Sequence, residues 1–82
     1  MEYKMELKSM VYIGNICEAH KGLTEDEIIE LHFDNENVIN ILKTDELNKM
    51  SGDLEIIRTS NTCSVYVDTA FVKYMIIKRR FL

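Results

Sequence analysis

The chain has 82 residues and a mass of 9.6 kDa, and its formal net charge at pH 7 is −4. This length allows one domain, residues 1–82, with a thin core, and excludes a large enzyme with a deep pocket. With 46% apolar residues, 29% charged residues and two cysteines, the chain is neither a disordered protein nor a disulfide scaffold. No apolar run approaches the roughly 18 residues of a membrane span, and the N-terminus has no signal-peptide pattern, so we expect a cytoplasmic protein.

The N-terminal segment fits two structures. Charged and apolar residues alternate over residues 2–8, which is the period of a strand. Tyr3, Leu7 and Met10 also fall at helical spacing, and Met, Glu, Leu and Lys favour helices. We expect a helix over residues 5–20 and leave open a strand over the first few residues.

A helix start follows at Thr24. The hydroxyl of this residue can cap a helix while Glu27, three residues later, bonds back to the amide of the cap. Acidic residues fill the first turn, where the helix dipole favours them. With Ile28 and Leu31 on one face, the pattern predicts a helix over residues 25–32.

Another helix is predicted after it. Asp34 or Asn35 can cap this helix, and an apolar stripe follows over residues 38–42. The helix either extends to the Ser51-Gly52 pair that ends it or is kinked at Thr44, which can cap a new turn.

The C-terminal third has the character of strands. Residues 54–59 and 63–67 are rich in β-branched side chains, and the polar residues between them form a turn, so the pattern predicts a β-hairpin. Residues 69–82 fit either a helix capped by Asp68 or a further strand.

With helical ends, this order of elements resembles the winged-helix variant of the helix-turn-helix domain. The resemblance is carried by residues 20–31, with their Gly-Leu-Thr helix start, then by residues 35–47 and residues 54–69. It implies an α+β fold of three helices, a β-hairpin wing and a C-terminal helix. The alternative fold is an antiparallel sheet with two helices on one face.

The resemblance also implies a small DNA-binding protein that regulates transcription. Its third helix would read duplex DNA in the major groove, where Asn can pair with adenine and Thr can take several partners, and its wing and tail would contact phosphates. The residues predicted to contact DNA are Asn37, Asn40, Lys43 and Thr44 on the helix, and Arg58, Lys78, Arg79 and Arg80 on the wing and tail.

We further predict a homodimer. The C-terminal run is more apolar than one small domain needs to expose, and a thin core favours association. The residues predicted to pair the two chains are Val72, Met75, Ile76 and Phe81.

The charge distribution supports a second function. Residues 23–56 carry ten acidic and two basic residues, whereas residues 57–82 carry five basic and one acidic residue. The basic third suits nucleic acid. The acidic middle suits a protein-interaction module or inhibitor that occupies a basic site on a nucleic-acid-processing enzyme, as small viral or phage proteins that imitate DNA do. The sequence does not decide which surface is functional.

Motifs of catalysis are absent from the sequence. It has no glycine-rich phosphate loop, no nucleophile in a recognisable catalytic pattern and no His-Glu metal motif. We therefore expect neither an enzyme nor a bound cofactor or metal.

Overall fold

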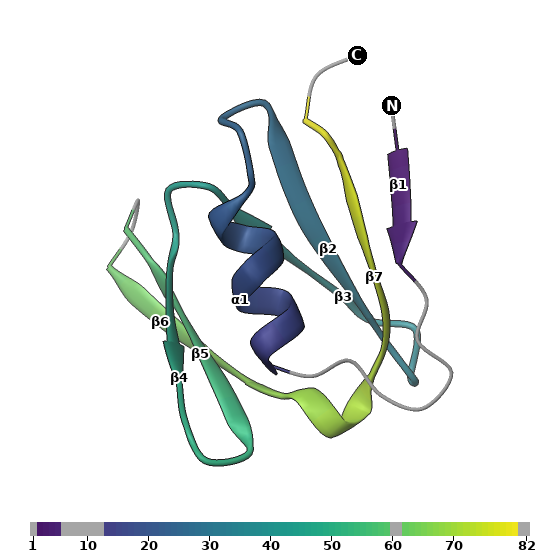
Figure 1. The fold of residues 1–82 in the computed structure, drawn as a ribbon. Coiled ribbons are helices and arrows are strands. Elements are labelled where there is room, and N and C mark those ends of the chain that lie inside the picture. Colours follow the sequence, from purple (N-terminus) through teal and green to yellow (C-terminus); the bar gives the residue numbers. More distant parts are fainter. Residues whose placement is uncertain (1, 6–12, 60–61, 81–82) are drawn as a thin grey trace.

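The computed structural model describes residues 2–5, 13–59 and 62–80, which form one short α-helix, one 3₁₀ turn and seven strands. The strands make two antiparallel sheets, with the α-helix lying across one side of them (Figure 1). In chain order the elements are β1 (Glu2–Met5), α1 (Ile13–Lys21), β2 (Glu27–Phe33), β3 (Val38–Leu42), β4 (Glu46–Lys49), β5 (Asp53–Arg58), β6 (Cys63–Asp68), the 3₁₀ helix η1 (Thr69–Phe71) and β7 (Val72–Arg79).

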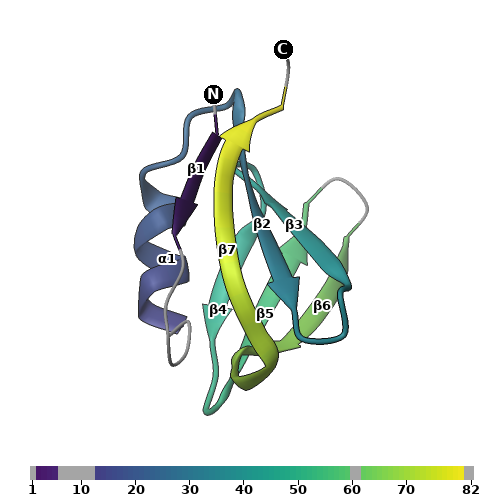
Figure 2. The ribbon, with the colours of Figure 1, turned by 90° about the vertical axis from the view of Figure 1, so that its right-hand side faces the viewer.

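Distant parts of the chain meet in the first sheet. Its strand order is β1-β7-β2-β3, so the last strand lies between the first two (Figure 2). The second sheet is a meander in the order β4-β5-β6. The chain crosses from the first sheet to the second at residues 43–45 and returns through η1. The strands β1, β3, β4 and β6 consequently lie at sheet edges.

The winged-helix fold predicted from the sequence is wrong, and so is the alternative of one sheet with two helices on one face. The segment predicted as the helix 25–32 is largely β2. Ile29 and Leu31 on one face of this strand are fully buried, and Ile28 on the other face is 8% exposed. A central strand can bury side chains on both faces, and this burial outweighs the local helical pattern.

One bond of the predicted Thr24 cap forms, from the Thr24 amide to Glu27, but the Glu27 amide bonds the Thr24 carbonyl in place of its hydroxyl, and no α-helix starts there. The Thr24 amide donates to Glu27 Oε1 at 3.0 Å, and the Glu27 amide donates to the Thr24 carbonyl at 3.1 Å. These bonds close a turn that leads into β2. Similarly, Asp68 Oδ1 accepts from the Ala70 amide at 3.0 Å and caps the single turn of η1.

The remaining segments divide between correct and wrong predictions. The hairpin is confirmed as β5 and β6. The predicted helix over residues 34–50 is replaced by β3 and β4, and the C-terminal helix is wrong because the chain forms β7 there. At the N-terminus the strand that was left open is β1, and the helix described in this region is α1.

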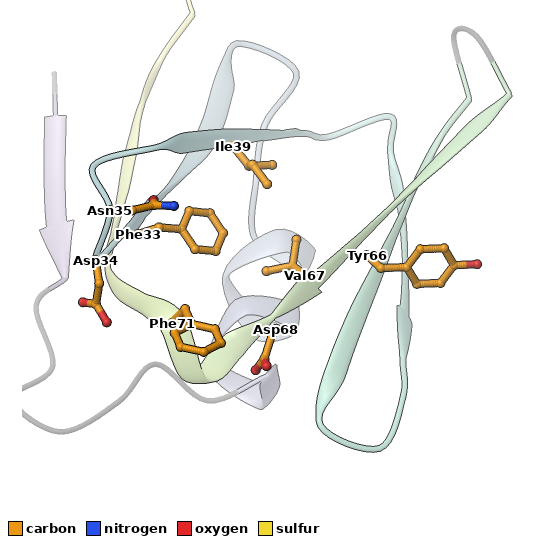
Figure 3. Close-up of a pocket in the computed structure, with 8 residues that line it drawn as sticks. All are labelled: Phe33, Asp34, Asn35, Ile39, Tyr66, Val67, Asp68 and Phe71. Carbon is orange, nitrogen blue, oxygen red and sulfur yellow. The ribbon is translucent and has the colours of Figure 1, made fainter.

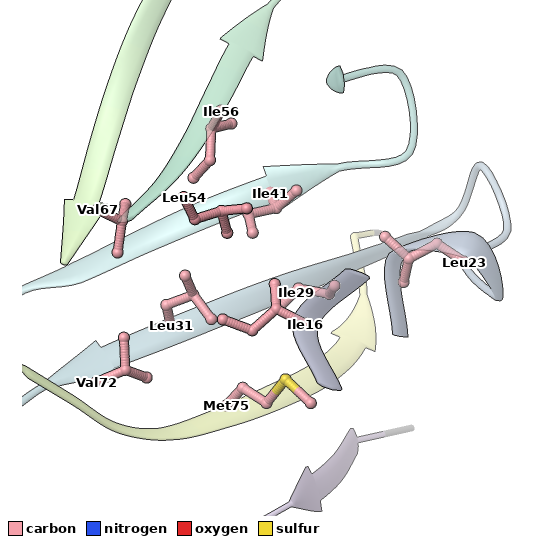
Figure 4. Packing of buried hydrophobic residues seen from close by; sticks show 10 residues of the cluster. All are labelled: Ile16, Leu23, Ile29, Leu31, Ile41, Leu54, Ile56, Val67, Val72 and Met75. Carbon is pink, nitrogen blue, oxygen red and sulfur yellow. The ribbon is translucent and has the colours of Figure 1, made fainter. Parts of the chain in front are cut away.

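Both sheets and the helix share one core, whose centre is shown in Figure 4. Ile16 of α1 is fully buried, and His20 Nε2 donates to the Leu42 carbonyl at 3.0 Å, which ties the helix to the end of β3. The buried cluster comprises Ile16, Leu23, Ile29, Leu31, Ile41, Leu54, Ile56, Val67, Val72 and Met75. No helix in the described residues is long and apolar enough to cross a membrane.

Candidate binding cavity between the two sheets

A cavity of about 430 Å³ opens between the first sheet and the second, next to their edge strands β3 and β6 (Figure 3). This volume lies in the usual range of ligand pockets, roughly 300–1,000 Å³. The cavity is lined by Phe33, Asp34, Asn35, Ile39, Tyr66, Val67, Asp68 and Phe71.

The inner walls of the cavity are apolar. Phe33 stands at the end of β2, Ile39 in β3 and Val67 in β6, and the three side chains extend toward the space between the strands (Figure 3). Val67 is 2% exposed and belongs to the core, so the cavity floor is also the surface of the core. An apolar group placed here would be removed from water on several sides.

The rim of the cavity carries two carboxylates and an exposed aromatic ring. The Asp34 amide donates to the Phe71 carbonyl at 3.1 Å, which joins the β2–β3 turn to η1. Asp68 is positioned by capping η1. Phe71 is 59% exposed and lies between the two acids in the view of Figure 3. None of the lining residues is Lys, Arg or His.

The outer face of the second sheet continues this negative charge. Because side chains alternate along a strand, the residues in register with Glu55 lie on the face opposite the buried Leu54 and Ile56. The described residues on this face include four acids and no base. We define this acidic face as Glu46, Asn48, Asp53, Glu55, Ile57, Ser64, Tyr66 and Asp68.

Hydrogen bonds across three strands fix the centre of the acidic face. Asn48 Nδ2 donates to Glu55 Oε1 at 3.0 Å, and the Tyr66 hydroxyl donates to Glu55 Oε2 at 3.1 Å. The hydrogen bonds from Asn48, Ser64 and Tyr66 to the Glu55 carboxylate lower its pKa below the usual value. The same carboxylate raises the pKa of Tyr66. The centre of the face is therefore anionic at neutral pH.

The four residues predicted to read bases do not share a helix. Asn37 lies in the β2–β3 turn, Asn40 is exposed on β3, and Lys43 and Thr44 belong to the turn before β4. Lys43 Nζ donates to the Lys21 carbonyl at 3.5 Å, across to the end of α1. The structure therefore provides no helix at these positions that could enter a major groove.

The residues predicted to contact phosphates are spread over two strands. Arg58 in β5 is half-buried and forms an ion pair with the buried Asp45. Lys78 Nζ in β7 lies 2.7 Å from Glu30 Oε2. Arg79 and Arg80 are exposed at the end of the same strand. Arg58 and Lys78 thus already have carboxylate partners within the chain.

Three of the residues predicted to form the dimer are buried in a single chain. Val72 and Met75 are 4% and 1% exposed and belong to the core. Ile76, on the opposite face of β7, is 8% exposed. Phe81 lies outside the described residues. The predicted homodimer does not follow from these side chains, because neighbours in the same chain already cover the three that are described.

Asp34 belongs to the acidic middle that the sequence shows, whereas the aromatic and apolar part of the cavity was not predicted from the sequence. Phe33 and Phe71 each stand close in sequence to an acid at the end of a strand, in Phe33-Asp34 and in the stretch 68–71. The one feature of the sequence that indicates this part of the cavity is an aromatic residue close to an acid at two separate turns. That these two turns lie next to each other could not be inferred without the strand order.

Possible metal ligands are scattered. Cys17 and His20 lie on α1, whereas His32 is on β2 and Cys63 begins β6. Within residues 13–59 and 62–80, no three His, Cys, Asp or Glu side chains gather into a group that could hold a metal ion.

Comparisons with known proteins identify no relative: no protein-family model, no curated protein sequence and no solved structure matches this chain.

Proposed function

We propose that this protein is an acidic protein-interaction module that holds a basic segment of a partner protein in the cavity between β3 and β6. The observation that carries the proposal is the composition of the cavity: apolar walls, two rim carboxylates, an exposed phenyl ring and no basic residue. Basic segments of this kind are common in proteins that handle nucleic acids, which include the enzymes that the acidic middle was expected to inhibit.

The cavity matches the chemistry of a long basic side chain. The aliphatic stem of Arg or Lys can pack against Phe33, Ile39 and Val67. Its cationic head can then meet the carboxylates of Asp34 and Asp68 in charge-assisted hydrogen bonds. The ring of Phe71 adds a surface for a cation–π contact. An acidic or purely polar segment would leave these groups without complementary partners.

The acidic face extends the same preference beyond the cavity. Asp68 belongs to both, and Asp53 is its register partner on β5. Carboxylates along the path of a partner favour encounter with positive charge and disfavour negatively charged surfaces. This supports a partner whose basic residues extend past the one that enters the cavity.

Binding of a labelled basic peptide tests the proposal. The probe is a fluorescein-labelled peptide of about six residues that alternates valine and arginine, titrated with protein while its anisotropy is measured. We expect Asp34→Asn with Asp68→Asn to weaken binding about tenfold or more. Asn keeps the capping oxygen at position 68, so the double variant removes charge but retains the cap.

The controls separate the cavity from the overall charge. Glu25 is exposed in the turn before β2 and does not line the cavity, so Glu25→Gln removes one charge elsewhere and should leave affinity within about twofold. A peptide with glutamate in place of arginine should not bind. If the double variant binds the basic peptide as the parent does, or if no binding appears at about 1 mM protein, the proposed function is wrong.

A further inference from the structure

One edge of the cavity presents backbone groups as well as side chains. The Phe33 amide points toward Asn37 and donates to its carbonyl at 2.9 Å, so in the antiparallel register the pairs that exchange backbone hydrogen bonds are Leu31–Ile39 and Ile29–Ile41. The N–H and C=O groups of Val38, Asn40 and Leu42 therefore point away from β2.

Among the residues that the structure describes, the outward backbone groups of Leu42 have hydrogen-bond partners and those of Val38 and Asn40 have none. The Leu42 amide donates to Asp45 Oδ2 at 2.9 Å, and its carbonyl accepts from the Asp45 amide at 3.1 Å. Within residues 13–59 and 62–80, no hydrogen bond reaches the outward backbone groups of Val38 and Asn40. Two consecutive outward positions thus form an open hydrogen-bonding edge.

The sequence of β3 does not protect this edge. Natural proteins commonly block edge strands with charged residues, proline or bulges. The edge strands β1, β4 and β6 each contain at least one charged residue, whereas β3, Val-Ile-Asn-Ile-Leu, contains none. Val38 is 45% exposed. β3 is therefore the described edge best suited to accept another strand.

The open edge and the cavity share a residue. Ile39 lies between Val38 and Asn40, and its side chain lines the cavity. In an added strand, the residue opposite Ile39 would place its side chain on the same face of the sheet, toward the cavity. Its neighbours would face outward beside Val38 and Asn40. Backbone pairing and occupation of the cavity are thus geometrically compatible.

We propose that the partner segment binds as an added β-strand on β3, through the backbone groups of Val38 and Asn40, with a basic side chain opposite Ile39 reaching toward the rim carboxylates. This inference rests on the proposed function and specifies how the segment is held. The occupant is an extended segment of another protein. The two rim carboxylates favour a positively charged side chain, and an added strand places every second side chain on the cavity side.

Amide hydrogen exchange tests the pairing directly. In uniformly ¹⁵N-labelled protein saturated with the valine–arginine peptide, we expect the amides of Val38 and Asn40 to exchange at least about tenfold more slowly than in the free protein. The amides of Ile39 and Ile41 already point toward β2 and serve as internal references. Unchanged exchange at Val38 and Asn40 in the saturated complex would overturn strand addition.

A backbone-modified peptide provides the matched control. Methylating the alternate amide nitrogens that face β3 removes the donors of the added strand but keeps every side chain and charge. Methylation of the other set of alternate amides, which face away from β3, serves as the reference. We expect the first peptide to bind at least about tenfold more weakly than the second. Equal binding of the two would overturn strand addition while leaving the cavity proposal in place.

A substitution in the protein checks the same contact. Asn40→Pro removes the outward amide of β3, whereas Asn40→Ala retains it. The proline variant should lose affinity for the peptide about tenfold and the alanine variant less than about twofold. If the proline variant does not fold, the methylated peptides still decide the question.

The results distinguish the cavity proposal from strand addition, and they also distinguish a partner segment from a second copy of this chain. Loss of binding in the Asp34→Asn, Asp68→Asn variant without protection at Val38 and Asn40 supports the cavity and overturns strand addition. Exchange protection in the peptide-free protein that grows with protein concentration would assign the edge to a second copy of this chain and overturn the assignment to a partner segment.

Discussion

Arg58, which the sequence predicts to contact DNA phosphates, forms an ion pair with Asp45 in the same chain. Asp45 is 3% exposed, accepts the Leu42 amide at 2.9 Å and forms an ion pair with Arg58. It stands in the turn where the chain passes from the first sheet to the second. Arg58 reaches this turn from β5, so the pair fixes the crossing between the sheets. Truncating Arg58 would therefore destabilise the fold, so a loss of DNA binding in such a variant would not by itself demonstrate a phosphate contact.

Removing the carboxylate should destabilise the protein. Asp45→Ala leaves the Arg58 guanidinium without its partner and the Leu42 amide without its acceptor. We expect the free energy of unfolding to fall by about 3 kcal/mol, since breaking a buried pair costs about 3–5 kcal/mol and Arg58 keeps some access to water. Urea denaturation measures this loss. The neighbouring exposed acid is the control, and Glu46→Ala should change stability by less than about 0.5 kcal/mol. A loss below about 1 kcal/mol for Asp45→Ala would show that the pair does not fix the crossing.

Glu30 should give the protein a defined acid sensitivity. Burial raises the pKa of this carboxyl, but the hydrogen bonds from Lys78 at 2.7 Å and His32 at 3.1 Å lower it by more, and the net pKa lies below the ordinary value of 4.5. Because the folded pKa is depressed, the ionised carboxylate stabilises the folded state above the unfolded pKa, and this contribution is lost as pH falls through the folded pKa.

The variant Glu30→Gln tests that sign. At pH 7 its free energy of unfolding should be lower than that of the parent, and the difference should shrink as the pH is lowered below about 4.5. Urea unfolding at a series of pH values provides the measurement. Glu25→Gln, at an exposed site, should stay within about 0.5 kcal/mol of the parent throughout. A difference that is constant down to about pH 3 would contradict the assigned role of the Glu30 carboxylate.

At the scale of elements, the sequence predicted hydrogen bonds between nearby residues but not which distant strands pair. The Thr24–Glu27 bond and the Asp68 cap both form as the sequence indicates, yet each closes a short turn. The β5–β6 hairpin was predictable because its strands are adjacent in sequence. By contrast, β7 pairs with β1 and β2, which lie far away along the chain. A short window of sequence carries no information about such distant partners. The segment that forms β2 was therefore predicted as a helix from its local pattern alone.

Two glycines should respond oppositely to alanine. Gly52 in the β4–β5 turn has φ +85°, a conformation that alanine adopts only with strain, so Gly52→Ala should lower stability by about 1 kcal/mol. Gly14 lies in α1, and a methyl group added there would meet no atom of another element within 4 Å among the described residues. Gly14→Ala should raise stability by about 0.5–1 kcal/mol. Thermal unfolding of the two variants provides the comparison, and shifts of the same sign would contradict it.

At the scale of the whole molecule, the site depends on the path of the chain. Asp34 follows β2 and Phe71 ends η1, and they meet only because β7 returns beside β2. The sequence predicted an acidic surface for a basic partner, and Asp34 is one of its acids, whereas Asp68 lies in the C-terminal third that the sequence marked as basic. It did not predict a cavity, because Ile39 and Val67 face each other from different sheets. Charge is a local property of the sequence, whereas the cavity is a property of topology.

The distribution of charged residues predicts that the protein binds a basic peptide in preference to duplex DNA. The cavity rim and the acidic face carry carboxylates without a base, whereas Arg58 and Lys78 are held by carboxylates of the same chain. Affinity for the valine–arginine peptide should therefore fall about tenfold between low and high salt, because added ions screen the attraction.

Competition in the anisotropy assay checks this preference. An unlabelled copy of the peptide should displace the labelled one. Labelled duplex DNA, titrated with protein in the absence of the cationic peptide because that peptide itself binds DNA, should show no rise in anisotropy, since DNA would bring phosphates toward carboxylates. The double variant Asp34→Asn, Asp68→Asn should show a weaker salt dependence than the parent, because two of the attracting charges are gone. A rise in the anisotropy of the labelled duplex, together with a DNA mobility shift at about 50 µM protein or below, would favour the nucleic-acid function predicted from the basic C-terminal third.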